Sequence, residues 1–62
     1  MTQAEQIAYI RIILGDLSTA TLPDATITLF LNRWCTAFNY PDDQTKEWYV
    51  IYNTCCDCLR WL

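Results

Sequence analysis

The chain has 62 residues, of which 53% are hydrophobic and 15% aromatic, and its formal net charge is −3. A chain of this length forms one domain with a marginal core, because it buries only about 60% of the surface that its unfolded form exposes. Its four basic residues are spread along the sequence, which argues against the clustered positive face of a nucleic-acid-binding protein. It has no histidine and a single glycine, which excludes the commonest catalytic base and any glycine-rich phosphate loop.

The sequence shows no signal for secretion or for a membrane span. Its N-terminal part lacks a positive segment, and polar residues interrupt its first apolar run. No stretch approaches the roughly 18 consecutive apolar residues of a membrane helix. We therefore expect no membrane partner and a reducing compartment, in which thiols stay free.

A first helix is predicted to begin at Thr2. The spacing of Thr2 and Glu5 is that of a capping box, in which each side chain accepts a hydrogen bond from the other residue's backbone N–H. Gly15 is expected to end the helix, because glycine enters the left-handed conformation without steric cost. Apolar residues follow the capping box at helical spacing: Ile7, Ile10, Leu14 and Leu17.

A second helix is predicted from about Pro23 to Phe38. Proline suits the first turn of a helix, where its missing N–H costs nothing, and Asp24 is favourable at the positive end of the helix dipole. The residues after this helix read as a turn in which Asp42 or Asp43 caps the next helix, rather than as an acid–base pair. One apolar stripe faces the expected core: Ile27, Phe30, Leu31, Trp34 and Phe38.

A third helix is predicted from about Gln44 to the last residue, Leu62. No glycine, proline or charged cluster ends it, so we expect the single domain of residues 1–62 to continue further or to be held there by a partner. A second stripe of Val50, Thr54 and Trp61 lies nearly opposite its core face, which indicates contact with a neighbouring subunit. The expected core face consists of Trp48, Ile51, Tyr52, Cys55, Cys58, Leu59 and Leu62.

The four cysteines allow three interpretations. Cys35, Cys55, Cys56 and Cys58 equal the number of thiols in a structural zinc site, but three of them fall inside one predicted helix instead of in pairs separated by a loop. Cysteine is also among the most frequently buried residues, so we favour packing over a metal site or a disulfide. We therefore predict no metal and no cofactor.

Aromatic residues outside the core stripes are the candidate site. A base-stacking platform is disfavoured because no positive charge alternates with the aromatic residues, and no nucleophile–base pair can be assembled for catalysis. Trp34, Trp48 and Tyr52 are assigned to the core, and Asp57 to a solvated or intersubunit face. The predicted subunit or partner interface consists of Tyr9, Ile12, Tyr49, Val50 and Trp61.

The order of short motifs resembles a known family. Arg11 to Asp16 read R-x-x-L-G-D, and residues 22 to 31 read L-x-D-x-x-I-x-x-F-L. An acidic turn then precedes the last helix. From Ile10 to Leu62, this arrangement resembles the head–tail connector proteins of tailed bacteriophages, also called adaptor or head-completion proteins.

The resemblance implies an all-α, three-helix virion structural protein that is not an enzyme. Such proteins form a ring, typically of twelve copies, in the neck of the virion after assembly in the host cytoplasm. The ring docks beneath the portal protein, contacts tail or neck proteins and extends a channel through which DNA passes without specific binding. Two alternatives remain open at this point: a small cytosolic adaptor or regulatory domain, and a cysteine-rich metal-binding module.

Overall fold

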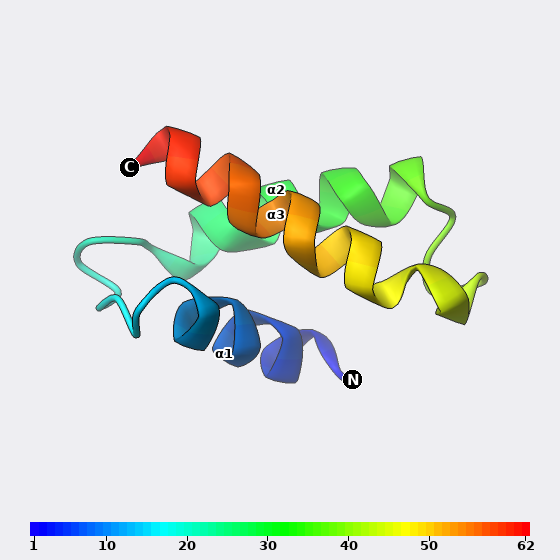
Figure 1. The fold of residues 1–62 in the computed structure, drawn as a ribbon, viewed down its shortest axis with the longest axis horizontal. Helices are drawn as coiled ribbons and strands as arrows, with labels where there is room; N and C mark the ends of the chain where they lie inside the picture. Colours follow the sequence, from blue (N-terminus) through cyan, green and yellow to red (C-terminus); the bar gives the residue numbers. More distant parts are fainter.

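The computed structural model describes residues 1–62 as three α-helices and one short 3-10 helix. These are α1 (Gln3–Ile13), α2 (Asp24–Ala37), η1 (Gln44–Lys46) and α3 (Glu47–Trp61). In Figure 1, α3 lies in front of α2, and α1 lies below both. This arrangement confirms the all-α fold with a long C-terminal helix. None of the helices is long and apolar enough to cross a bilayer.

Both ends of α1 follow the predicted signals. The Thr2 hydroxyl accepts a hydrogen bond from the Glu5 backbone N–H at 3.2 Å, and the Glu5 carboxylate accepts one from the Thr2 N–H at 2.8 Å. Gly15 takes the left-handed conformation with φ +91°, and Asp16 follows it with φ 59°. The capping box and the glycine stop are therefore confirmed.

The turn between α2 and α3 uses short polar side chains. Pro23 precedes α2 as its N-cap residue, and Asn39 takes a left-handed conformation just after the helix, with φ 57°. The Asp43 carboxylate accepts from the Thr45 backbone N–H at 3.1 Å and from the Thr45 hydroxyl at 2.5 Å. Asp43 is thus the predicted cap, although the segment it caps is the 3-10 turn of η1, and α3 begins three residues later than expected.

The core is small and draws on all three helices and one loop. Phe30, Trp34 and Phe38 of the predicted α2 stripe are half-buried against it. Leu22 enters the core from the loop between α1 and α2, although the sequence pattern does not assign this residue to a core stripe. The fully or nearly fully buried apolar residues are Ile10, Leu22, Ile27, Leu31, Val50, Ile51, Cys55 and Cys58.

The predicted core face of α3 is partly wrong, because the helix is rotated about its axis relative to that prediction. Ile51, Cys55 and Cys58 are buried as expected, but Val50 and Thr54 are buried with them. The Thr54 hydroxyl donates to the Val50 carbonyl oxygen at 2.7 Å, so its burial leaves no polar group without a partner. Four residues assigned to the core are instead exposed: Trp48, Tyr52, Leu59 and Leu62.

Asp57 is buried, so its predicted position on a solvated or intersubunit face is also wrong. Its carboxylate accepts a hydrogen bond from the Trp34 indole N–H at 2.7 Å. Arg33 and Arg60 lie over the same carboxylate, at 3.9 and 3.5 Å. A buried carboxylate is tolerated here because a donor and two positive charges surround it.

Candidate functional site

The Arg11 motif stabilises the loop between α1 and α2. One nitrogen of the Arg11 guanidinium donates to the Leu17 carbonyl oxygen at 3.0 Å, and another donates to the Asp24 carboxylate. The loop is thereby held against the helices, and Leu22 is brought into the core. The R-x-x-L-G-D stretch therefore serves the fold, and its arginine is not available to a ligand.

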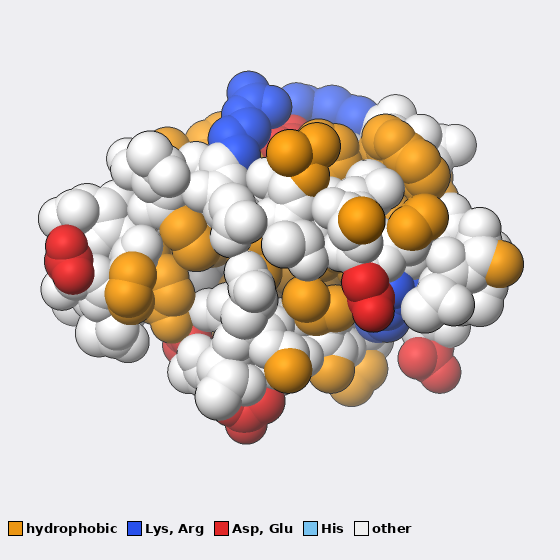
Figure 2. Space-filling view, turned by 180° about the vertical axis from the view of Figure 1, so that it is seen from behind, with side chains coloured by type: hydrophobic (Ala, Val, Ile, Leu, Met, Phe, Trp, Pro, Cys, Tyr) orange, Lys and Arg blue, Asp and Glu red, His pale blue; other side chains and the backbone are white.

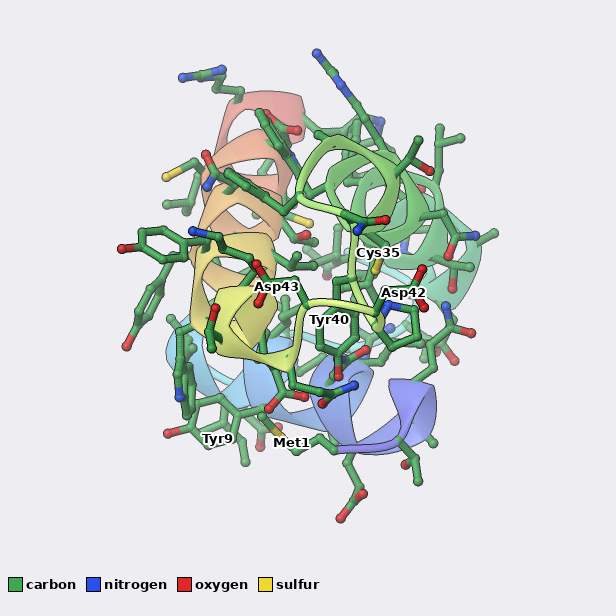
Figure 3. All side chains as sticks on the ribbon, turned by 90° about the vertical axis from the view of Figure 1, so that its right-hand side faces the viewer. Met1, Tyr9, Cys35, Tyr40, Asp42 and Asp43 are labelled. Carbon is green, nitrogen blue, oxygen red and sulfur yellow. The ribbon has the colours of Figure 1, made fainter.

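A polar cluster joins α1, the turn after α2 and the start of α3. The Glu47 carboxylate accepts from the Tyr40 hydroxyl at 2.7 Å, from the Gln6 side-chain amide at 3.2 Å and from the Met1 amine at 3.0 Å. A cavity of about 400 Å³ lies beside it, with Cys35 and Tyr40 in its lining. Figure 3 shows Tyr40 between α1 and α2, next to Cys35 of α2.

Glu47, Tyr40 and Cys35 hold fixed protonation states near neutral pH. The hydrogen bond from Tyr40 holds the pKa of Glu47 below its usual value, and the same bond raises the pKa of Tyr40 to about 12. Burial raises the pKa of the Cys35 thiol. A general acid or base works best with a pKa near the working pH, so this arrangement is suited to structure rather than to proton transfer.

The four cysteines are free thiols in different surroundings. Cys55 and Cys58 lie in the core, where burial raises their pKa values, that of Cys55 to about 11. Cys35 is half-buried, and Cys56 is exposed on α3. No three cysteine or acidic side chains lie close enough together to hold a metal ion.

Exposed aromatic side chains form a first row between α1 and α3. The rings of Tyr9 and Trp48 meet edge to face with centroids 5.3 Å apart, and Trp48 stacks on Tyr52 at 5.8 Å. All three side chains are exposed, as are Ile13, one helical turn after Tyr9, and Leu59, two turns after Tyr52. Figure 3 shows Tyr9 at the outer edge of the molecule, on the side of α3 away from Cys35. We call Tyr9, Trp48 and Tyr52 the first aromatic row.

A second aromatic row lies between α2 and α3 and consists of Trp34, Phe38 and Tyr49. Successive ring centroids are 5.8 Å apart in both pairs. Cations lie over both ends: the Arg33 guanidinium is 5.4 Å from the Trp34 ring centre, and the Lys46 ammonium is 5.1 Å from that of Tyr49. Figure 2 views the molecule from the α2 side and shows basic side chains gathered at its upper edge.

The structure exposes four of the five predicted interface residues. Tyr9, Ile12, Tyr49 and Trp61 are between 41% and 66% exposed, whereas Val50 is fully buried, so its predicted place on the surface is wrong. Tyr9 belongs to the first row and Tyr49 to the second, so they lie on different sides of α3. Whether these residues contact a partner stays a prediction.

Sequence reasoning missed Trp48 and Tyr52 as surface residues. Their four-residue spacing puts them on one helix face, which was interpreted as a core stripe. The available signal was their amphipathic character: aromatic residues with a polar atom are common at protein interfaces, where one edge remains wet. Hydrophobic spacing alone does not separate such a face from a core face.

Fold and surface together define a small all-α domain whose surface is rich in aromatic side chains. The sequence model of the family described as "Bacteriophage PhiTE adapter protein" matches residues 1–62, and the chain belongs to this family. It is therefore a phage structural adaptor, and the resemblance to phage adaptor proteins is confirmed. Neither the curated proteins nor the solved structures contain a match to the chain.

Proposed function

We propose that this protein forms a ring of identical copies that joins the portal of the DNA-filled phage head to the tail. The ring lies in the neck of the virion, contacts tail or neck proteins and extends the DNA channel. Membership of a phage adapter family over the whole chain supports this role. An adaptor acts by surface complementarity, so the function requires no catalytic residue and no cofactor.

The observation that carries the proposal is the amount of aromatic surface on so small a domain. Only 11 of the 62 residues are buried, while Trp48, Tyr49, Tyr52 and Trp61 are all exposed on α3. Aromatic residues are enriched in the centres of protein interfaces, where they contribute most of the binding energy. A helix with aromatic rings on two sides is suited to contacts with more than one neighbouring subunit.

The charge of the chain agrees with a DNA conduit rather than a DNA-binding protein. A net charge of −3 gives each copy an overall repulsion toward phosphate. Arg11 is engaged with Asp24, and the Asp57 carboxylate lies under Arg33 and Arg60 and offsets part of their charge. DNA is therefore expected to pass through the ring without being held.

The test is the mass of the assembly in solution, measured by size-exclusion chromatography with light scattering. The chain is measured alone and mixed with the portal protein of the same phage, and ring shape is checked by negative-stain electron microscopy. We expect ring-sized assemblies, or co-elution with the portal, and no change when a chelator is added. A chain that keeps its 7.3 kDa monomer mass and does not bind the portal would contradict the proposal.

The chelator arm also tests the metal-module alternative. Loss of helix signal on chelation would show that the thiols hold a structural metal, since such domains unfold without it.

Substitution Leu29→Ser supplies a matched control for surface changes, because Leu29 is 66% exposed on α2 and belongs to neither aromatic row.

A further inference from the structure

We infer that neighbouring copies bind head to tail, with the first aromatic row of one copy packed against the second aromatic row of the next. This inference rests on the proposed ring and names the surfaces that build it. A closed ring of more than two copies needs two different complementary patches on each subunit, whereas a single self-complementary patch gives only a dimer. The two rows supply two such patches.

The rows lie on different sides of one helix. Trp48 of the first row and Tyr49 of the second are consecutive in α3, so their side chains leave the helix about 100° apart. The first row continues onto α1 through Tyr9, and the second continues onto α2 through Phe38 and Trp34. A copy bound through one row therefore leaves the other row free, and each contact rotates the next copy relative to the last.

Most of the basic residues lie at the second row. Three of the four basic residues lie there: Arg33 over Trp34, Lys46 over Tyr49, and Arg60 beside Arg33 at Asp57. The fourth, Arg11, is engaged with Asp24. Basic residues that are spread along the sequence thus converge in space on one side of the molecule.

The carboxylates near these basic residues neutralise only part of their positive charge. Asp57 is buried beneath the two arginines, and Asp43 is engaged in capping η1. Figure 3 shows Asp42 on the side of the turn that faces away from α3. The guanidinium of Arg60 is largely exposed, so it can reach a carboxylate on another chain.

The first row has a negative charge at its α1 end. Glu5, the capping carboxylate of α1, is exposed one helical turn before Tyr9 on the same face of the helix. No lysine or arginine borders Tyr9, Trp48 and Tyr52 in the way that Arg33 and Lys46 border the second row. Opposite charges around two aromatic patches fix their register and favour correct pairing over self-pairing of like surfaces.

The experiment mixes two variants, each with one row damaged. The first-row variant carries Tyr9→Ser and Trp48→Ser, and the second-row variant carries Tyr49→Ser and Arg33→Glu; all four side chains are exposed, and circular dichroism verifies the fold. We expect each variant alone to remain monomeric, and the 1:1 mixture to form a heterodimer with twice the monomer mass and nothing larger. Only a head-to-tail contact gives this pattern, because the mixture retains one intact pair of surfaces.

Three outcomes would overturn the inference. If one variant dimerises by itself, the row that is intact in that variant is self-complementary. If both variants assemble like the wild type, the ring exists but uses other surfaces, and the proposed function survives. If the wild type assembles neither alone nor on the portal, both proposals fail. Leu29→Ser is the control and should assemble like the wild type.

Cys56 provides a second readout that needs no further substitution. It is the exposed cysteine of α3 and lies one helical turn after Tyr52, in line with the first row. Packing of this row in the assembly should slow alkylation of Cys56 by a maleimide at least tenfold relative to the monomeric first-row variant. An equal rate in the assembled wild type and in that monomer would show that the first row is not covered.

Discussion

At the residue scale, Arg11 connects three segments through one side chain. Its guanidinium joins α1 to the Leu17 carbonyl and to Asp24 at the start of α2. The Arg11 side chain is only 13% exposed, whereas Asp24 is 64% exposed, so the hydrogen bond to the loop carbonyl matters more than the surface ion pair. The loop conformation that buries Leu22 depends on this contact.

We expect Arg11→Met to destabilise the protein by about 1–3 kcal/mol, because it leaves the Leu17 carbonyl without its donor while keeping most of the side-chain volume. The measurement is urea unfolding followed by tryptophan fluorescence. Arg60→Met is the matched control and should cost less than about 1 kcal/mol, since the Arg60 side chain is 81% exposed. Equal losses in the two variants would show that the loop contact contributes nothing.

The Tyr40–Glu47 pair gives stability a defined dependence on pH. The pKa of Glu47 is lower in the folded protein than its ordinary value of 4.5, so its contribution is present above about pH 4.5 and is lost as the pH falls through the folded value. The pKa of Tyr40 is raised from 10.0 to about 12, so its contribution is present below pH 10 and is lost as the pH rises toward 12.

We therefore expect Glu47→Gln to flatten the acid side of the stability profile. Below pH 4.5 the wild type should lose stability faster than the variant, because only the wild type must protonate a carboxylate that Tyr40 stabilises. Chemical denaturation at a series of pH values measures the difference, which removes the shared contributions of Glu5 and Asp43. Parallel profiles for the two proteins would contradict the assignment.

At the scale of elements, α1 depends on its capping box. Thr2→Ala removes the hydroxyl that accepts the Glu5 N–H, and such losses cost about 0.5–2 kcal/mol. For a domain of this size, 1 kcal/mol corresponds to roughly 4–8 °C in the midpoint of thermal unfolding. We expect a decrease of this order by circular dichroism. Thr19→Ala, in the exposed loop, is the control and should leave the midpoint unchanged.

The ends of the helices could be predicted from the sequence where a nearby residue determines the backbone conformation. Thr2, Gly15 and Asp43 act within a few residues of their own position, and their roles followed from spacing alone. The rotation of α3 could not be predicted in this way. It depends on where Thr54 and Asp57 find partners, and the partner of Asp57 is the indole of Trp34 on another helix.

The candidate site was only partly predictable for the same reason. Tyr9 and Tyr49 were correctly placed on the surface because they lie outside the apolar stripes. The prediction assigns Trp48 and Tyr52 to the core because the spacing of hydrophobic residues identifies a helix face that needs to be covered. The spacing does not show whether the same chain or another protein covers that face. The convergence of Arg33 and Arg60 on one edge likewise arises from the crossing of α2 and α3, which no stretch of sequence contains.

At the scale of the whole molecule, the core is too small to account for the apolar content of the chain. Eight apolar residues are buried, but 53% of the sequence is hydrophobic, and the remainder lies at or near the surface. Small domains gain stability by oligomerisation, because contacts between copies bury area that the monomer cannot bury. Folding and assembly are therefore expected to be linked in this protein.

This linkage predicts that the thermal unfolding midpoint rises with protein concentration. Binding of one copy to another favours the folded state by mass action, so dilution should lower the midpoint of the wild type. The dependence should be lost in the Tyr9→Ser, Trp48→Ser variant, whereas Leu29→Ser should retain it, because only the first of these damages an aromatic row. Circular dichroism over a hundredfold range of concentration makes the measurement. A wild-type midpoint that does not move with concentration, in a sample that light scattering shows to be assembled, would mean that the copies associate without stabilising one another's fold.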